Sequence, residues 1–384
     1  MAHRFLSKSK KGEYPFINLL ITLLIVLILA SIFSMYSITG GIIDYMVKKQ
    51  LFISIASLLV IFIFSQISTN FIFYHSYNIY ILIIIILIVT EFLGHRVMGA
   101  KRWINLGLIN IQPSEFMKIG VILALSRYFH NCHTNEIIRP KFSLFPIILV
   151  LLPTFLILKQ PNLGTAVIII LTAITMFFLT EIKIKMFFYL GILSILSIPL
   201  VWRFLHDYQK TRVLTFLNPE SDTLGTGYNI IQSIISIGSG GMFGKGFLKG
   251  SQNQLDFLPE NHTDFIFGLI AEESGFIICL ILLLIYSAII FILYLMSMQC
   301  SSQFYRLLIL GFTSLLFFHV FINVAMVSGL LPVVGVPLPF LSYGGSNLIA
   351  MTIGIGLVLN AYLNKNTIIA RGNNFTLYSL RRKN

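Results

Sequence analysis

Long apolar runs are the feature of this sequence that most constrains its fold. The first run extends from Phe16 to Ile38 without a charged residue. Roughly 20 apolar residues suffice for a helix to cross a bilayer, whose core accommodates only helices and closed barrels. The runs lack the two-residue alternation of barrel strands. Because 57% of the residues are hydrophobic and only 11% are charged, we expect an all-α polytopic membrane protein.

The apolar runs predict about ten transmembrane helices. Their expected ranges are 16–38, 51–67, 71–91, 113–130, 144–158, 163–181, 186–204, 265–296, 306–328 and 346–364. The first run is too long for the apolar core of a signal peptide, so we expect it to be retained. A single membrane-embedded domain is expected over residues 1–384, with a large loop at 202–264 between the seventh and eighth helices.

The positions of lysine and arginine orient these helices. Basic residues gather in the tails at 1–15 and 365–384 and in the loop after the fourth helix. In a ten-helix arrangement these segments share one side, and such an excess marks the cytoplasm. Both tails are therefore expected inside and the 202–264 loop outside.

Because much of the positive charge lies in these cytoplasmic segments, the net charge of +13 is not taken to indicate a nucleic-acid partner. The three cysteines match no metal motif and predict no disulfide framework.

Several basic residues break this rule because they fall on the external side. They include Lys101, Arg102, Lys210, Arg212 and Lys245. Late loops can tolerate positive charge once earlier helices are inserted. Alternatively, these residues meet an anionic ligand, such as a phosphate at the level of the outer headgroups.

A glycine-rich segment at 238–246 contains Lys245 and superficially resembles a phosphate-binding loop. It does not fit the nucleotide-binding motif, because Ser239 stands at the first glycine position and Gly246 replaces the Ser or Thr that would hold magnesium. We expect a loop or a short re-entrant element, with Lys245 available to an anion.

Three acidic residues, Glu115, Asp264 and Glu272, are candidates for functional chemistry. Glu115 lies three residues before Lys118, so the two share a helix face, and Asn162 could join them. They form either a structural pair or part of a cavity. Asp264 either caps the eighth helix or acts at the outer interface as a general base or metal ligand. Glu272 is expected on the side of a shared cavity, whereas Glu273 is expected to point to the opposite side.

Several motifs, taken together, resemble the SEDS family of bacterial membrane glycosyltransferases. The matching segments are Gly99–Trp103, Gln112–Glu115 with Lys118, Lys159–Pro161, Phe216–Glu220, Gly227–Ser233, Gly238–Gly246, Phe257–Phe267 and Pro332–Ser346. Within the family the chain looks more similar to the elongation type (RodA-like) than to the division type (FtsW-like), because Val333–Pro337 follows the elongation pattern and the N-terminus is short.

The resemblance implies an activity. Such proteins polymerise lipid II into glycan strands on the outer face of the bacterial cytoplasmic membrane, and Asp264 matches the family's catalytic aspartate. The basic residues named above are then candidates for the pyrophosphate, and His262 and Glu272 for further substrate contacts. A divalent cation, Mg²⁺ or Mn²⁺, is plausible, and no organic cofactor is expected. Expected partners are lipid II, a class B penicillin-binding transpeptidase and other membrane proteins of the elongation complex.

One residue departs from the family pattern. Asn162 stands where relatives usually have Asp, so no essential carboxylate can be carried over to this position.

Two other hypotheses about function stay open from the sequence. The chain could be a flippase for the same lipid, because ten spans and intramembrane charges also suit transport. It could also be a non-catalytic scaffold for cell-wall enzymes.

Overall fold

The computed structural model describes residues 15–97, 100–105, 110–132, 140–180, 191, 196, 203, 207–222, 225–250 and 262–370. Long helices account for most of them. They are α2 (Pro15–Ile38), α3 (Tyr45–Gln66), α4 (Thr69–Leu93), α5 (Pro113–Asn131), α7 (Pro140–Lys159), α8 (Leu163–Phe178), α13 (Ile266–Met298), α14 (Gln303–Val327) and α15 (Gly345–Leu363).

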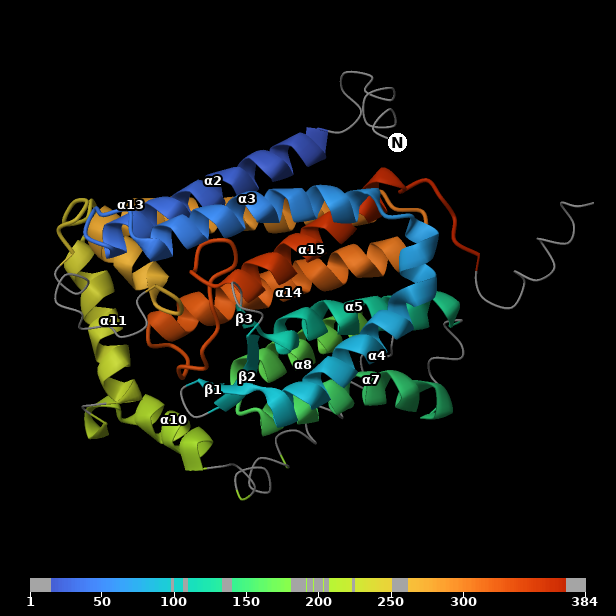
Figure 1. Ribbon diagram of the computed structural model, residues 1–384, viewed down its shortest axis with the longest axis horizontal. Coiled ribbons are helices and arrows are strands. Elements are labelled where there is room, and N and C mark those ends of the chain that lie inside the picture. Colours follow the sequence, from blue (N-terminus) through green and yellow to red (C-terminus); the bar gives the residue numbers. More distant parts are fainter. Residues whose placement is uncertain are drawn as a thin grey trace, which may run out of the picture.

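These helices lie roughly parallel in a layered bundle (Figure 1). One outer layer contains α2, α3 and α13, the other contains α4, α5, α7 and α8, and α14 and α15 lie between them. The central helices are more enclosed than four of the outer ones: 72% and 83% of the apolar stretches of α14 and α15 are buried, against 33% for α2, α3, α4 and α13. Most residues of α5 are buried as well. The less buried helices keep an apolar face for lipid, whereas polar groups on α5, α14 and α15 must find partners inside the protein.

The predicted membrane helices agree with the structure wherever it describes them. Nine of the ten expected ranges coincide with the helices named above, and the seventh, 186–204, lies largely outside the described residues. Within the described part, six helices are long and apolar enough to cross a membrane. The chain is therefore a multi-pass helical membrane protein.

The segment expected as a large loop contains helices of its own. They are α10 (Asp207–Leu217), the 3₁₀ turn η1 (Pro219–Ser221) and α11 (Thr226–Gly240). Helix α11 packs on α13 and α14, and α10 and α11 lie across one end of the bundle (Figure 1). The loop predicted from Gly238 is therefore wrong at its start, because α11 continues to Gly240. A Cβ on Gly240 would lie 1.9 Å from the Ala271 carbonyl oxygen, so glycine serves close helix packing here.

A small antiparallel sheet lies at the same end. Its strands are β1 (His95–Val97), β2 (Ala100–Asn105) and β3 (Asn110–Ile111), in the order β1-β2-β3. The Ser346 hydroxyl at the start of α15 donates to the Asn110 carbonyl at 2.7 Å and accepts from the Gln112 amide at 3.0 Å. These bonds fix the sheet against the central layer.

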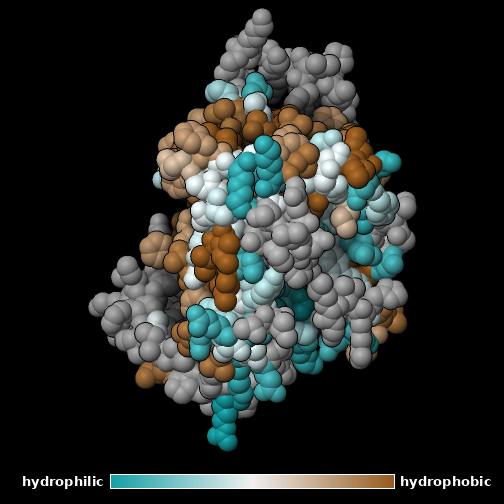
Figure 2. All heavy atoms as spheres, turned by 90° about the vertical axis from the view of Figure 1, so that its left-hand side faces the viewer, coloured by the Kyte–Doolittle hydropathy of each residue, from teal (hydrophilic) through white to brown (hydrophobic). Residues whose placement is uncertain are grey.

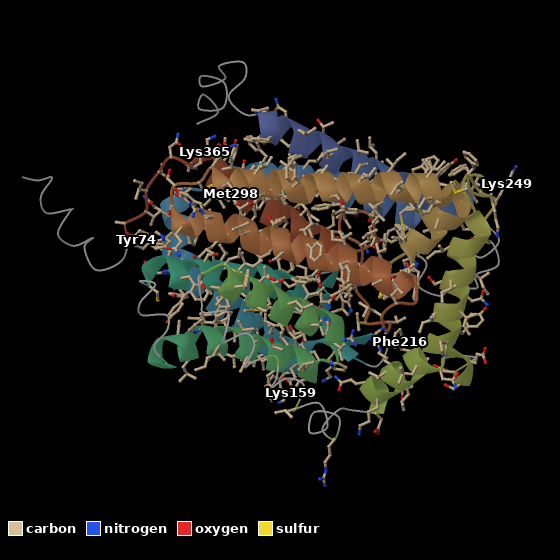
Figure 3. All side chains as sticks on the ribbon, turned by 180° about the vertical axis from the view of Figure 1, so that it is seen from behind. Tyr74, Lys159, Phe216, Lys249, Met298 and Lys365 are labelled. Atoms are coloured by element: carbon tan, nitrogen blue, oxygen red, sulfur yellow. The ribbon has the colours of Figure 1, made fainter. Side chains whose placement is uncertain are left out.

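We call the end that carries α10, α11 and this sheet the α11 end. Lys249, Phe216 and Lys159 lie there, whereas Lys365, Met298 and Tyr74 lie at the opposite end (Figure 3). These two groups of residues lie at opposite ends because the predicted helices run alternately in opposite directions along the bundle. Viewed from the α11 end, hydrophobic residues gather over the upper part of the molecule, and hydrophilic residues are scattered among and below them (Figure 2).

Candidate functional site

Asp264 lies at the α11 end, in the turn that leads into α13, and its side chain is partly exposed. The N-cap position of α13 is Phe265, so Asp264 precedes the helix rather than capping it. Its carbonyl oxygen accepts a hydrogen bond from Asn323 Nδ2 at 2.8 Å. Its carboxylate atom Oδ2 lies 3.4 Å from the position that a Cβ atom on Gly335 would take. The carboxylate is thus next to the proline-rich segment at 332–343.

His262, two residues before Asp264, also contacts the proline-rich segment at 332–343. Its ring contacts Tyr343, with centroids 5.7 Å apart and planes at 68°. Its carbonyl oxygen accepts from the Tyr343 amide at 2.9 Å. The backbone on both sides of Asp264 is therefore anchored, and the part of the motif at 257–261 lies outside the described residues.

Lys245 and Glu272, both expected near substrate, form an ion pair. Lys245 Nζ lies 2.6 Å from Glu272 Oε1, and the Glu272 side chain is almost fully buried. The Lys245 amide also donates to the Glu272 carbonyl at 2.9 Å, and the Phe276 amide donates to the Gly241 carbonyl at 2.9 Å. The turn at 240–246 is therefore attached to α13 by both backbone and side chain, and Glu272 is an anion that Lys245 binds in this structure.

This attachment coincides with a break in α13. Gly275 has φ 79° and ψ −178°, a left-handed conformation that glycine adopts readily. On the neighbouring turn, the Ser37 hydroxyl at the end of α2 lies 2.6 Å from both carboxylate oxygens of Glu273. Glu273 does not point away from Glu272 as expected. A Cβ on Gly250 would lie 3.1 Å from Glu272 Oε2 and 3.3 Å from Glu273 Oε1, because the 244–250 segment passes both carboxylates.

A second polar cluster is buried among α5, α8, α14 and α15. Lys118 Nζ lies 2.8 Å from Glu115 Oε2, which confirms the predicted pair. Glu115 also accepts from Asn347 Nδ2 at 2.6 Å and from the Thr165 hydroxyl at 3.5 Å. Lys118 Nζ lies 2.7 Å from His319 Nε2. A buried charge pair with all these partners is well satisfied.

The tautomer of His319 follows from its neighbours. An ammonium group can only donate, so Nε2 must accept from Lys118 and the ring proton sits on Nδ1. Nδ1 then faces the Pro337 carbonyl at 3.4 Å. His319 therefore connects the buried ion pair to the proline-rich segment beside Asp264.

Asn162 lies beside this cluster without bonding to Glu115 or Lys118 directly. Its Oδ1 accepts from the Thr165 amide at 3.4 Å, which caps α8, and its Nδ2 donates to the Ser114 hydroxyl at 3.1 Å. Arg102 holds the adjoining turn, donating from Nε to the Gln160 carbonyl at 2.8 Å and from Nη2 to the Pro161 carbonyl at 2.6 Å. A neutral amide suits this position because its contacts are a cap and a hydroxyl.

The other basic candidates also lie at the α11 end. Lys101 is on β2, and Lys210 and Arg212 are on α10; all three are partly exposed. Helix α10 packs on α11 and η1. The structure thus gathers all the predicted external cations at the end that holds Asp264.

A lipid-facing groove opens between α2 and α3. Its volume is about 880 Å³, and it is lined by Leu29, Ala30, Ile32, Phe33, Tyr36, Ile43, Val47, Lys48 and Leu51. Phe247, from the segment that passes Glu272, stacks on Phe33 with ring centroids 4.5 Å apart. The groove therefore adjoins the Lys245–Glu272 attachment.

No group of three His, Cys, Asp or Glu side chains with metal-binding geometry occurs within the residues that the structure describes. Asp264 could still contribute one carboxylate to a cation, since Mg²⁺ is commonly held by one or two carboxylates together with substrate phosphates.

Four partners in these clusters were not singled out from the sequence: Ser37, His319, Asn323 and Asn347. His319 and Asn323 lie four residues apart in an apolar run, so they share a face of α14. Polar residues inside a membrane helix generally mark an interior contact, and that signal could have found them. It would not have named their partners.

Comparisons with known proteins agree over nearly the whole chain. The family FtsW/RodA/SpoVE, described as cell cycle protein, matches residues 13–367. The peptidoglycan glycosyltransferase MrdB of Escherichia coli strain K12 is 39% identical over 363 residues, covering 93% of this chain and 97% of MrdB.

Two solved structures have the same fold. One comes from work on a peptidoglycan synthase complex that coordinates polymerization and crosslinking; it has a TM-score of 0.79 and 30% identity, and the match covers 91% of this chain and 98% of the other. The other is the rod shape-determining protein RodA of Thermus thermophilus, with a TM-score of 0.68, 26% identity and coverage of 91% and 97%. The chain described here belongs to the FtsW/RodA/SpoVE family.

Proposed function

We propose that this protein is a peptidoglycan glycosyltransferase that polymerises lipid II on the outer face of the bacterial cytoplasmic membrane during elongation. The observation that carries the proposal is the similarity to MrdB over 93% of the chain, in a fold that exposes Asp264 at the end where the external cations gather. The similarity to RodA of Thermus thermophilus supports the elongation type over the division type.

We propose the reaction that the resemblance to the SEDS family implies. The Asp264 carboxylate accepts the proton of the acceptor's 4-hydroxyl, and the resulting oxygen attacks the anomeric carbon of the growing strand. The bond between that carbon and the pyrophosphate breaks, and undecaprenyl pyrophosphate leaves with the electron pair. General base catalysis of this kind contributes about 10²- to 10⁴-fold.

Cations at the α11 end are proposed to stabilise the leaving group. Negative charge develops on the pyrophosphate as the bond breaks, so nearby Lys and Arg favour the transition state over the ground state. Lys101, Lys210 and Arg212 are partly exposed there. Mg²⁺ or Mn²⁺ bound at Asp264 would supply additional positive charge, and chelation by EDTA is then expected to lower the rate.

The lipid-facing groove and the membrane helices support a lipid-linked substrate. We also propose a class B penicillin-binding transpeptidase as partner, because a similar structure comes from work on a synthase complex that combines polymerization with crosslinking. Both termini are proposed to lie in the cytoplasm.

The test compares glycan polymer formed from lipid II by purified wild-type protein and by Asp264→Asn, with and without partner. We expect the variant to lose about 10²- to 10⁴-fold in rate. Asp44→Asn is the matched control: Asp44 caps α3 by accepting from the Val47 amide at 3.0 Å, and Asn caps a helix equally well. Full polymerisation by a folded Asp264→Asn protein would refute the proposal. Leaflet exchange of fluorescent lipid II in liposomes without polymer would favour the flippase hypothesis instead.

A further inference from the structure

We infer that Asn323 is a positioning residue that sets the location of the Asp264 carboxylate. The inference rests on the proposed function, since it assigns to Asn323 a role in the same reaction. Asn323 is on α14, is fully buried and does not itself reach the membrane surface or the external face.

The side-chain amide of Asn323 joins the two segments that flank the site. Nδ2 donates to the Asp264 carbonyl at 2.8 Å and to the Val336 carbonyl at 2.7 Å. An amide nitrogen has two protons, so one group satisfies both acceptors at once. The reversed orientation would place Oδ1 against two carbonyl oxygens, which fixes the rotamer. The turn carrying Asp264 is thereby held at a set distance from the proline-rich segment.

The second segment matters because it lies next to the carboxylate itself. Gly335 precedes the Val336 acceptor, and a Cβ on Gly335 would lie 3.4 Å from Asp264 Oδ2. Moving either carbonyl away from Asn323 would therefore change the space around the carboxylate. A displacement of about 1 Å at a reacting group can cost about 10²-fold in rate.

The same face of α14 connects this position to the buried ion pair. His319 lies one turn before Asn323, with Nδ1 3.4 Å from the Pro337 carbonyl and Nε2 2.7 Å from Lys118 Nζ. Val336 and Pro337 are consecutive, so α14 holds two adjacent carbonyls of the segment through His319 and Asn323. The Glu115–Lys118 pair and Asp264 are thus attached to one rigid element.

The experiment measures kcat and KM for lipid II polymerisation by Asn323→Leu, which keeps the branched shape of the side chain, at a larger volume, but removes both donors. We expect kcat to fall about 10²-fold, with KM within about threefold, because the substrate contacts themselves are unchanged. The double variant with Asp264→Asn is expected to be no slower than Asp264→Asn alone, since Asn323 acts through Asp264.

Asn360→Leu is the matched structural control. Asn360 is also buried and also donates from Nδ2 to backbone carbonyls, including that of Ser65 at 3.0 Å, but it lies on α15 beside the end of α3, far along the bundle from Asp264. It should lower Tm as Asn323→Leu does and leave kcat within about twofold of wild type. If Asn323→Leu does not fold, Asn323→Ser and Asn360→Ser replace the pair.

The outcomes separate this inference from the proposed function. Wild-type kcat in a folded Asn323 variant, with Asp264→Asn inactive, would overturn the positioning role alone. Equal kcat losses in the Asn323 and Asn360 variants would also overturn it, because the effect would then be one of stability. Full activity of Asp264→Asn would instead remove the proposed function.

Discussion

At the scale of the residue, the Glu115–Lys118 pair shows how partners offset the cost of burying charge inside a membrane protein. Each side chain is nearly inaccessible, and each has a second partner, Asn347 for Glu115 and His319 for Lys118. Removal of one member leaves the other charge buried without its counterion, which costs about 3–5 kcal/mol.

We therefore predict that Glu115→Gln and Lys118→Met each lower the free energy of unfolding by about 3–5 kcal/mol. The double variant, which buries no charge, should be more stable than the sum of the two single losses implies. The coupling between the two side chains is measured by unfolding four proteins in detergent: the wild type, the two single variants and the double variant. Strictly additive losses would show that the two side chains do not interact.

Gly335 gives a second prediction at this scale. Its φ of +72° strains any other residue, at a cost of about 1–3 kcal/mol, and a Cβ would fill the space beside the Asp264 carboxylate, 3.4 Å from Oδ2. Gly335→Ala should lower both Tm and kcat for polymerisation. Gly40→Ala is the control, because Gly40 has φ +68° and open space around the missing Cβ. It should lower Tm alone; equal loss of kcat in both variants would contradict the role assigned to Gly335.

The sequence predicts these residues unequally. Spacing of three residues on one helix gives the Glu115–Lys118 pair directly. Their further partners cannot be predicted in this way, because His319 and Asn347 lie 201 and 232 residues away along the chain. The Lys245–Glu272 pair was missed for the same reason: its members lie 27 residues apart, on opposite sides of a segment with no regular period.

At the scale of the element, the break in α13 shows what length and hydropathy leave out. A single apolar run predicts one helix, and the structure has that helix, from Ile266 to Met298. Yet Gly275 departs from helical geometry, and the turn at 240–246 occupies the space beside it. The glycines at 238–246 predicted a turn. The helix α11 was not predicted, because its last glycines, at 238 and 240, were interpreted as part of that loop. Glycine in a helix signals close packing as often as a break.

We predict that Gly275→Ala detaches this turn. Its Cβ would lie 2.3 Å from the Gly244 nitrogen and 2.6 Å from the Met242 carbonyl oxygen, and both are backbone atoms that must move. The Lys245 and Gly246 amides, which donate to the Glu272 and Glu273 carbonyls, should then exchange hydrogen faster.

Hydrogen exchange followed by mass spectrometry tests this on the 240–246 peptide. Gly238→Ala serves as the control, because a Cβ there meets nothing within 4 Å. It should leave exchange unchanged and stabilise α11 by up to about 1 kcal/mol. Unaltered protection in Gly275→Ala would show that the turn is held by other contacts.

At the scale of the whole molecule, the proposed chemistry requires that the α11 end face outward. Lys249 lies at that end and Lys365 at the other (Figure 3). The described cysteines at 132, 279 and 300 are all buried and form no disulfide, so they can be replaced before reporter cysteines are introduced. A membrane-impermeant maleimide then distinguishes the two ends in intact cells.

We predict that Lys249→Cys is labelled in intact cells, whereas Asn366→Cys is labelled only after permeabilisation. Both positions are exposed, so access to the reagent decides the result. The physical reason lies in the basic tails beyond each terminal helix, which favour the cytoplasmic side during insertion. Since Asp264 and Lys249 lie at the same end of the bundle, these two labels also locate Asp264. The reversed pattern would put its carboxylate in the cytoplasm, where the proposed growing glycan strand does not exist, and the reaction could not take place there.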